Sequence, residues 1–151
     1  MATSTKLLGD AGEHYALSQF SLAGKYAAKM PDNWQGYDLA VETGSELVRV
    51  SVKTRSESAE LRDIPLFRWD HRKSCDWIVF VFMPKQGPFR SWVVPAKLAD
   101  EFATKSREWM DKPLDRELRL TRLGKPPLAE YADNWSMEVK ELATSSTEAS
   151  C

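Results

Sequence analysis

The 151-residue chain has few of the residues that build disulfide, zinc or nucleophile sites. Its two cysteines, Cys75 and Cys151, are far apart and form no CxxC pair, which excludes a disulfide framework and a thiolate zinc site. The two histidines, His14 and His71, have no spacing typical of a zinc site or of a base for a nucleophile. No GxSxG motif is present, so the sequence does not suggest a serine hydrolase either.

The chain also lacks a strong charge of one sign and any long apolar run. Twenty-one Lys and Arg stand against twenty-two Asp and Glu, which excludes a basic nucleic-acid coat protein but allows a local basic surface. No apolar run approaches the roughly 18 residues of a membrane span, and residues 1–14 lack the apolar core of a signal peptide. We therefore expect a cytoplasmic protein with no membrane association.

The length corresponds to one domain. We predict a single domain over residues 1–142 and a disordered tail over residues 143–151, because the tail is small and polar. No internal repeat interrupts the domain.

Hydrophobic periodicity predicts an α/β fold. A helix is predicted from Leu8 to about Gly24, and the charged residues 55–75 are predicted to form an excursion across a sheet. The apolar run 77–83 is typical of a central strand buried on both faces. The remaining predicted elements are strands at 25–30, 37–42, 46–54 and 89–94 and helices at 96–110 and 128–142. This order predicts a mixed central sheet flanked by helices.

One predicted strand has a polar face of unusual composition. In the segment 48–54, "VRVSVKT", the valines point one way and Arg49, Ser51 and Lys53 point the other. The turn at 43–45 makes this strand the antiparallel partner of the strand that contains Asp38. The face is either a solvated surface or the wall of an active site.

The hairpin brings Asp38 and Lys53 onto adjoining strands, and Glu13 reaches them if the first helix packs beside the hairpin. A hard divalent cation prefers oxygen ligands, which Asp38, Glu13 and the backbone carbonyl of Val52 offer. A lysine at such a site steers the attacking water and offsets the charge that builds on a phosphate. The three side chains therefore suggest metal-assisted phosphodiester chemistry.

These residues carry a resemblance to a known family. The segments "GDAGE", "YDLAVE", "VSVKT", "CDWIVFVF" and "WVVP" follow one another in an order and spacing that resemble the PD-(D/E)xK nuclease superfamily. The nearest branch has a helical GxxGE and a second motif that reads QVKT. The resemblance covers about residues 7–96 and implies a restriction-endonuclease-like core.

By position, the family's helix glutamate falls on Glu13, its metal-binding aspartate on Asp38 and its lysine on Lys53. The sequence departs from the family at Ser51, where an acid or glutamine is usual, and at Tyr37, where a proline usually precedes the aspartate. The literal Pro31-Asp32 lies in a loop well before the hairpin, and we reject it. Glu42 shares a strand face with Asp38 but lies near the turn, which is too far to replace the missing acid.

The resemblance implies a Mg²⁺-dependent DNA endonuclease. Asp38 and Glu13 are its expected metal ligands, Lys53 positions the nucleophile, and Arg49 and Arg55 are expected to hold backbone phosphates. Cleavage of both strands by a small domain implies a homodimer.

Two alternative functions remain open. One is an inactive member of the fold that binds nucleic acid or protein, because Ser51 replaces the second acid; the other is an α/β partner protein with no nucleic-acid role. "GDAGEH" is also compatible with a plain helix start, and Lys53 with a solvated strand lysine. Trp34 and Trp69, predicted to lie in loops, are candidates for stacking on bases.

Overall fold

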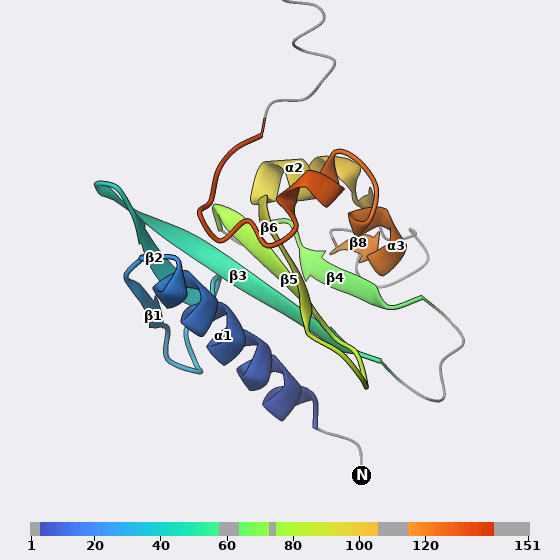
Figure 1. Ribbon diagram of the computed structural model, residues 1–151, viewed down its shortest axis with the longest axis horizontal. Helices are drawn as coiled ribbons and strands as arrows, with labels where there is room; N and C mark the ends of the chain where they lie inside the picture. The colour runs from blue at the N-terminus through green and yellow to red at the C-terminus, as the bar shows by residue number, and fades with distance from the viewer. Residues whose placement is uncertain (1–3, 58–63, 73–74, 106–114, 141–151) are drawn as a thin grey trace, which may run out of the picture.

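A five-stranded central sheet carries a helix on one face and a second, smaller sheet on the other (Figure 1). The computed structural model describes residues 4–57, 64–72, 75–105 and 115–140, so the predicted tail at 143–151 lies outside the described residues. The elements are α1 (Thr5–Leu22), β1 (Ala27–Lys29), β2 (Leu39–Thr43), β3 (Glu46–Ser56), β4 (Leu66–Asp70), β5 (Trp77–Met83), β6 (Arg90–Pro95), α2 (Ala96–Phe102), β7 (Thr104–Lys105), β8 (Asp115–Arg119), α3 (Leu120–Leu123) and the 3₁₀ helix η1 (Leu128–Tyr131).

The central sheet has the order β1-β2-β3-β5-β6 and is mixed. Strands β3 and β5 run parallel, whereas the other neighbouring pairs are antiparallel. The predicted fold class, an α/β domain with a mixed central sheet flanked by helices, is therefore confirmed. Within the described ranges, no helix combines the length and the apolar character that crossing a bilayer requires.

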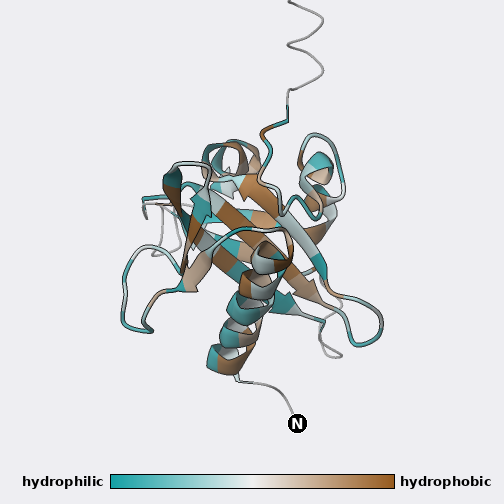
Figure 2. Cartoon of the chain, turned by 60° about the vertical axis from the view of Figure 1, so that its left-hand side comes forward, coloured by the Kyte–Doolittle hydropathy of each residue, from teal (hydrophilic) through white to brown (hydrophobic). Residues whose placement is uncertain are grey.

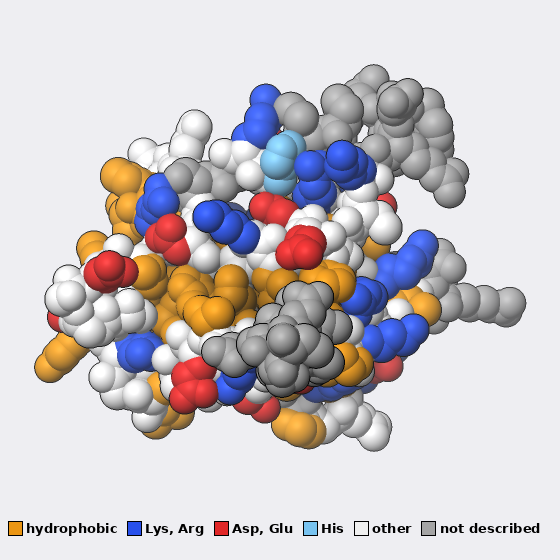
Figure 3. All heavy atoms as spheres, turned by 90° about the horizontal axis from the view of Figure 1, so that it is seen from above, with side chains coloured by type: hydrophobic (Ala, Val, Ile, Leu, Met, Phe, Trp, Pro, Cys, Tyr) orange, Lys and Arg blue, Asp and Glu red, His pale blue; other side chains and the backbone are white. Residues whose placement is uncertain are grey.

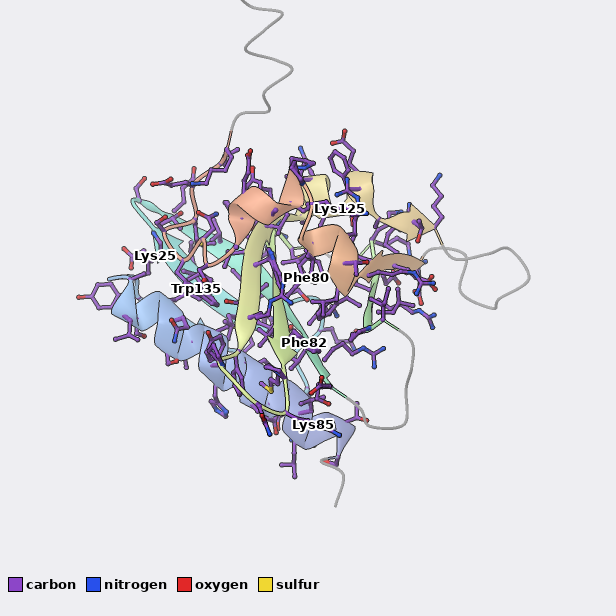
Figure 4. The ribbon with its side chains drawn as sticks, turned by 45° about the vertical axis from the view of Figure 1, so that its right-hand side comes forward. Lys25, Phe80, Phe82, Lys85, Lys125 and Trp135 are labelled. Carbon is purple, nitrogen blue, oxygen red and sulfur yellow. The ribbon has the colours of Figure 1, made fainter. Side chains whose placement is uncertain are left out.

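Strand β5 lies between β3 and β6 and is buried on both faces, as its apolar run predicts. One face packs against the small sheet: Phe80 stands edge-to-face with Phe67 of β4, with ring centroids 5.2 Å apart. Figure 4 shows Phe80 and Phe82 on the side of β5 that faces this sheet. The other face, with Val79 and Val81, packs in the core that α1 covers. Hydrophobic residues accordingly concentrate along the central strands (Figure 2).

Helix α1 approaches β3 very closely. Its buried residues are Gly12, Ala16 and Phe20. A Cβ atom at position 12 would collide with the hydroxyl oxygen of Thr54 on β3 and would lie 2.9 Å from the Thr54 Cβ. Only glycine permits this separation, so the second glycine of the "GDAGE" segment has a structural reason.

The predicted helix 96–110 ends at Phe102, and the prediction is wrong at residues 103–105. Ala103 adopts an extended conformation (φ −80°, ψ 153°), and Thr104 pairs with Glu117 of β8. Pairing with a strand distant in sequence overrides the local helical pattern. Residues 106–110 lie outside the described part of the chain.

The predicted helix 128–142 is also wrong. Only the short η1 forms, and Asp133 (φ 51°) and Met137 (φ 59°) then adopt left-handed conformations that a helix does not allow. The side chain of Asn134 holds the irregular segment in place, since its Nδ2 donates to the carbonyls of Val93 and Glu138. Residues 141 and 142 lie outside the described residues.

The excursion predicted over residues 55–75 contains strand β4, which pairs with β8 in the three-stranded sheet β4-β8-β7. Trp69 lies on β4 and not in a loop. Its side chain is 6% exposed and its indole nitrogen donates to Asp100 Oδ1 at 2.7 Å. Trp69 therefore belongs to the core, and the prediction that it stacks on bases is wrong.

We predict that Gly12→Ala destabilises the fold by about 1–3 kcal/mol, because the added methyl group forces α1 away from β3. For a chain of this size the melting temperature should fall by roughly 2–10 °C, measured by thermal unfolding followed by circular dichroism.

Gly9→Ala is the matched control on the same helix, since a Cβ at position 9 meets nothing within 4 Å. Its higher helix propensity should stabilise the chain by up to about 1 kcal/mol. Thr54→Ala in the Gly12→Ala background should restore part of the loss. Equal melting temperatures for the two glycine variants would contradict the close approach.

Candidate active site

Two adjoining grooves meet at Asp38. We call the first the acidic groove; it has a volume of about 230 Å³ and is lined by Thr5, Lys6, Gly9, Asp10, Glu13, Met30, Pro31, Asp32, Trp34, Tyr37 and Asp38. We call the second the strand groove; it has a volume of about 580 Å³ and is lined by Trp34, Gln35, Gly36, Tyr37, Asp38, Ser51 and Lys53. The fold thus places Glu13 on one side of Asp38, and Ser51 and Lys53 on the other.

Asp38 is fixed by the hairpin. Its backbone nitrogen donates to the carbonyl of Val50 at 2.9 Å, which continues the β2–β3 ladder. Its carboxylate Oδ2 accepts the backbone N–H of Val52 at 2.7 Å and the hydroxyl of Ser51 at 3.4 Å. A carboxylate that accepts a short backbone hydrogen bond is held in one orientation. Asp38 is therefore placed by the pairing of two strands.

Ser51 and Lys53 share the face of β3 turned toward the strand groove, as the alternation predicts. Ser51 is 7% exposed, and Lys53 is half-buried. Burial, with a smaller contribution from Asp100, raises the pKa of the Cys75 thiol to about 11, and the positive charge of Lys53 opposes this rise. Lys53 thus lies within electrostatic range of Cys75.

Glu13 enters the acidic groove from α1, with a side chain that is 19% exposed. Burial is the largest cause that raises the pKa of Glu13 to about 7, and the negative charge of Asp38 is the second. Lys29 Nζ lies 3.9 Å from Glu13 Oε1 and lowers the pKa in part. The two carboxylates therefore repel each other in a partly desolvated groove, which is an arrangement that favours a cation.

The carboxylates at this site fit a cation that also keeps water molecules or substrate phosphates as ligands. Among the described residues, no group of three or more His, Cys, Asp and Glu side chains is arranged to hold a metal ion. Mg²⁺, however, usually takes only one or two carboxylates, together with waters and substrate phosphates. Asp38 and Glu13 supply two carboxylates of this kind, whereas the Ser51 hydroxyl is already bonded to Asp38.

Arg49 and Arg55 lie outside the lining of both grooves. Arg49 pairs with Asp76: its Nη2 lies 3.1 Å from Oδ1, and its backbone N–H donates to Oδ2 at 2.8 Å. Arg55 is exposed and its Nε donates to the carbonyl of Leu66 at 2.7 Å. Their binding of phosphates stays a prediction.

Sequence reasoning missed Lys29, which lies on β1 between two acids. Its Nζ is 3.0 Å from Asp32 Oδ1 in addition to its contact with Glu13. Asp32 itself lines the acidic groove, but its side chain is 66% exposed and is paired with Lys29 and Lys6. Glu42 is exposed and lines neither groove. The periodicity of a three-residue strand is too short to have identified Lys29.

Comparison with known proteins gives matches in structure only. No protein-family model matches the chain, and no curated protein matches its sequence. The chain superposes on the bacterial homing endonuclease I-Ssp6803I with a TM-score of 0.57 and 19% identity, over 89% of this chain and 90% of the other. It also matches Hjc, a Holliday junction resolvase from Archaeoglobus fulgidus, with a TM-score of 0.48 and 10% identity, over 76% of this chain and 85% of that one.

The match to the homing endonuclease covers almost the whole of both chains. It confirms the predicted fold, because the chain shares its overall fold with this homing endonuclease. The predicted roles of individual residues do not follow from a likeness at this level of identity.

We predict that Glu13→Gln stabilises the chain above pH 7. The pKa of Glu13 is about 7 in the folded chain against 4.5 ordinarily, so ionising this carboxyl costs stability as the pH rises from 4.5 through 7. Gln avoids that cost, and the variant should gain about 1–3 kcal/mol at pH 8 and almost nothing at pH 4.5. Chemical denaturation in EDTA at several pH values measures the difference.

Glu42→Gln is the control, because Glu42 is exposed and remote from Asp38. Its stability relative to the parent should not vary across the same pH range. A pH-independent effect of Glu13→Gln would show that Glu13 is not in the desolvated, like-charged environment described.

Proposed function

We propose that the protein is a Mg²⁺-dependent DNA endonuclease of low intrinsic activity. The proposal rests on the position of Asp38, which lines both grooves. Glu13 lines the acidic groove with it, and Lys53 lines the strand groove with it. Two repelling carboxylates and a half-buried lysine in adjoining grooves are groups that can support the hydrolysis of a phosphodiester by a bound cation. The fold shared with a homing endonuclease supports the same conclusion.

In this proposal Asp38 and Glu13 hold the cation, and Lys29 restrains the Glu13 carboxylate. The bound cation would polarise the phosphate and lower the pKa of the attacking water. Lys53 donates hydrogen bonds to the attacking water or to the phosphate oxygen on which charge develops. Asp38 needs no further movement, because the Val52 N–H and the hairpin already orient its carboxylate.

Ser51 limits the proposed activity. A glutamate or glutamine extends its oxygen by two further carbons, roughly 2.5 Å given C–C bonds of about 1.5 Å. Mg²⁺ takes oxygen ligands at about 2.0–2.1 Å, and at this position Ser51 offers only a neutral hydroxyl in place of the usual carboxylate or amide oxygen. Its hydroxyl instead bonds to Asp38 Oδ2. We therefore expect weak metal binding and slow cleavage.

The second candidate function is an inactive nuclease fold that binds nucleic acid or protein. The short Ser51 side chain favours it, and so does the finding that, in the described residues, no group of three or more His, Cys, Asp and Glu side chains is arranged to hold a metal ion. One face of the molecule is mixed in charge. Figure 3 shows Lys and Arg side chains at the rims of the upper face, with acidic side chains among them. If the protein cuts both strands, we propose that it acts as a homodimer.

Ser51→Glu should raise Mg²⁺ affinity and the rate of cleavage, because it supplies the missing oxygen ligand. Ser51→Gln supplies the same reach without a third negative charge. Lys53→Ala should abolish whatever cleavage the parent shows. Plasmid nicking and calorimetric titration with Mg²⁺ measure the two effects.

Lys85→Ala is the matched control for Lys53→Ala. Figure 4 labels Lys85, which follows β5 and lines neither groove, so its loss should leave nicking unchanged. Robust parental cleavage that is indifferent to Lys53→Ala would place the chemistry elsewhere. No cleavage by the parent or by Ser51→Glu, with DNA binding intact, would favour the inactive alternative.

DNA binding should fall steeply as salt rises, and Arg49→Ala and Arg55→Ala should weaken it for all sequences alike. Removing one phosphate contact lowers the slope of log affinity against log salt by about one. Arg55→Ala is the cleaner test, because Arg49→Ala also breaks the pair with Asp76. Fluorescence anisotropy over a salt series measures the slope, and binding that is absent at low salt would remove DNA as a partner.

A further inference from the structure

The loop between β1 and β2 carries an aromatic pair that the proposed chemistry does not use. Trp34 is 49% exposed, although large aromatic side chains are usually buried. Its ring stands edge-to-face with that of Tyr37, with centroids 6.0 Å apart. Both residues line the acidic groove and the strand groove. An exposed tryptophan therefore lies where the two grooves meet.

The loop that carries this ring is held at both ends. The backbone N–H of Met30 donates to the carbonyl of Asp38 at 2.9 Å and closes the loop at its base. The backbone N–H of Trp34 donates to the carbonyl of Pro31 at 2.9 Å, which forms a turn. The backbone that carries the ring is thus tied to Asp38, and binding a ligand on the ring would require little ordering of the loop.

Cationic groups lie on both sides of the ring. Lys53 lines the strand groove, while Lys6 lines the acidic groove with a side chain that is 68% exposed and an Nζ that lies 2.9 Å from Asp10 Oδ2. A nucleotide that stacks its base on Trp34 therefore has the positive charge of Lys53 in the strand groove for a flanking phosphate, whereas the charge of Lys6 in the acidic groove is balanced by Asp10. Aromatic platforms with cations along the backbone path are typical of binding to single strands.

A fully paired duplex does not offer the same contact. Its base faces are stacked on one another, and only the base edges are open in the grooves. A base becomes available to an aromatic ring when it is unpaired or flipped out of the helix. The position of Trp34 beside Asp38 consequently selects among DNA structures.

We propose that Trp34, supported by Tyr37, is a stacking platform for an unpaired nucleobase next to the scissile phosphate. The inference rests on the proposed function for the position of that phosphate. It makes the preferred substrate a DNA with unpaired nucleotides, such as a single strand or a branch, in place of continuous duplex.

The test is binding of a fluorescein-labelled oligothymidylate, compared with a fully paired duplex that contains the same strand. Anisotropy is measured at low salt in EDTA, so that cleavage does not contribute. Trp34→Ala and Trp34→Leu should weaken single-strand binding roughly 5- to 100-fold, as expected for the loss of one stacked base. Trp34→Phe keeps an aromatic face and should retain most of the affinity. Duplex binding should change less than about twofold.

Tyr26→Ala is the control, because Tyr26 is 82% exposed but lines neither groove. Three results would overturn the inference: no single-strand binding by the parent, equal losses for single strand and duplex, or equal affinities of Trp34→Leu and Trp34→Phe. These outcomes are independent of the cleavage assay. Binding that depends on Trp34 without any cleavage would refute only the proposed catalysis, and cleavage with Trp34-independent binding would refute only the platform.

Discussion

The contact between Gly12 of α1 and Thr54 of β3 sets the geometry of the candidate site. Because position 12 has no side chain, the helix lies directly on the strand, and the Thr54 hydroxyl is left buried without a hydrogen-bond partner in the described structure. This close approach brings the next residue, Glu13, within electrostatic range of Asp38. A wider separation would leave two isolated carboxylates.

The same contact also creates electrostatic repulsion at the site, which is unfavourable for the folded chain when nothing is bound there. Glu13 is partly desolvated and faces a second negative charge, which stabilises its protonated form. Lys29 offsets only part of this repulsion. Charge repulsion that the fold maintains at a groove is a physical indication of function, because a cation or a proton relieves it. The hydrophobic core holds the two carboxylates in this arrangement, because β5 is buried on both faces and keeps β3 in place.

The two faces of the central sheet are covered by different elements. Helix α1 covers one face, and the small sheet with Phe67 and Trp69 covers β5 and β6 on the other. The groove at Ser51 and Lys53 opens on the part of β3 next to the region that the small sheet covers. The loop with Trp34 lines this groove together with Ser51 and Lys53 of β3.

Local patterns in the sequence determined the elements whose partners are close in the chain or whose burial is complete. The alternation in residues 46–54 and the apolar run 77–83 predicted β3 and β5, and the hairpin placed Asp38 opposite Ser51. The segments after Phe102 and after Tyr131 depended on distant partners, β8 and the carbonyl of Val93, which no local period encodes. Strand β4 could not be predicted from the local pattern for the same reason, because it pairs with the distant strand β8. The sequence also identified Glu13, Asp38 and Lys53 as candidate site residues. Only the tertiary structure decided which grooves they line, because the separation of α1 and β3 depends on packing at Gly12.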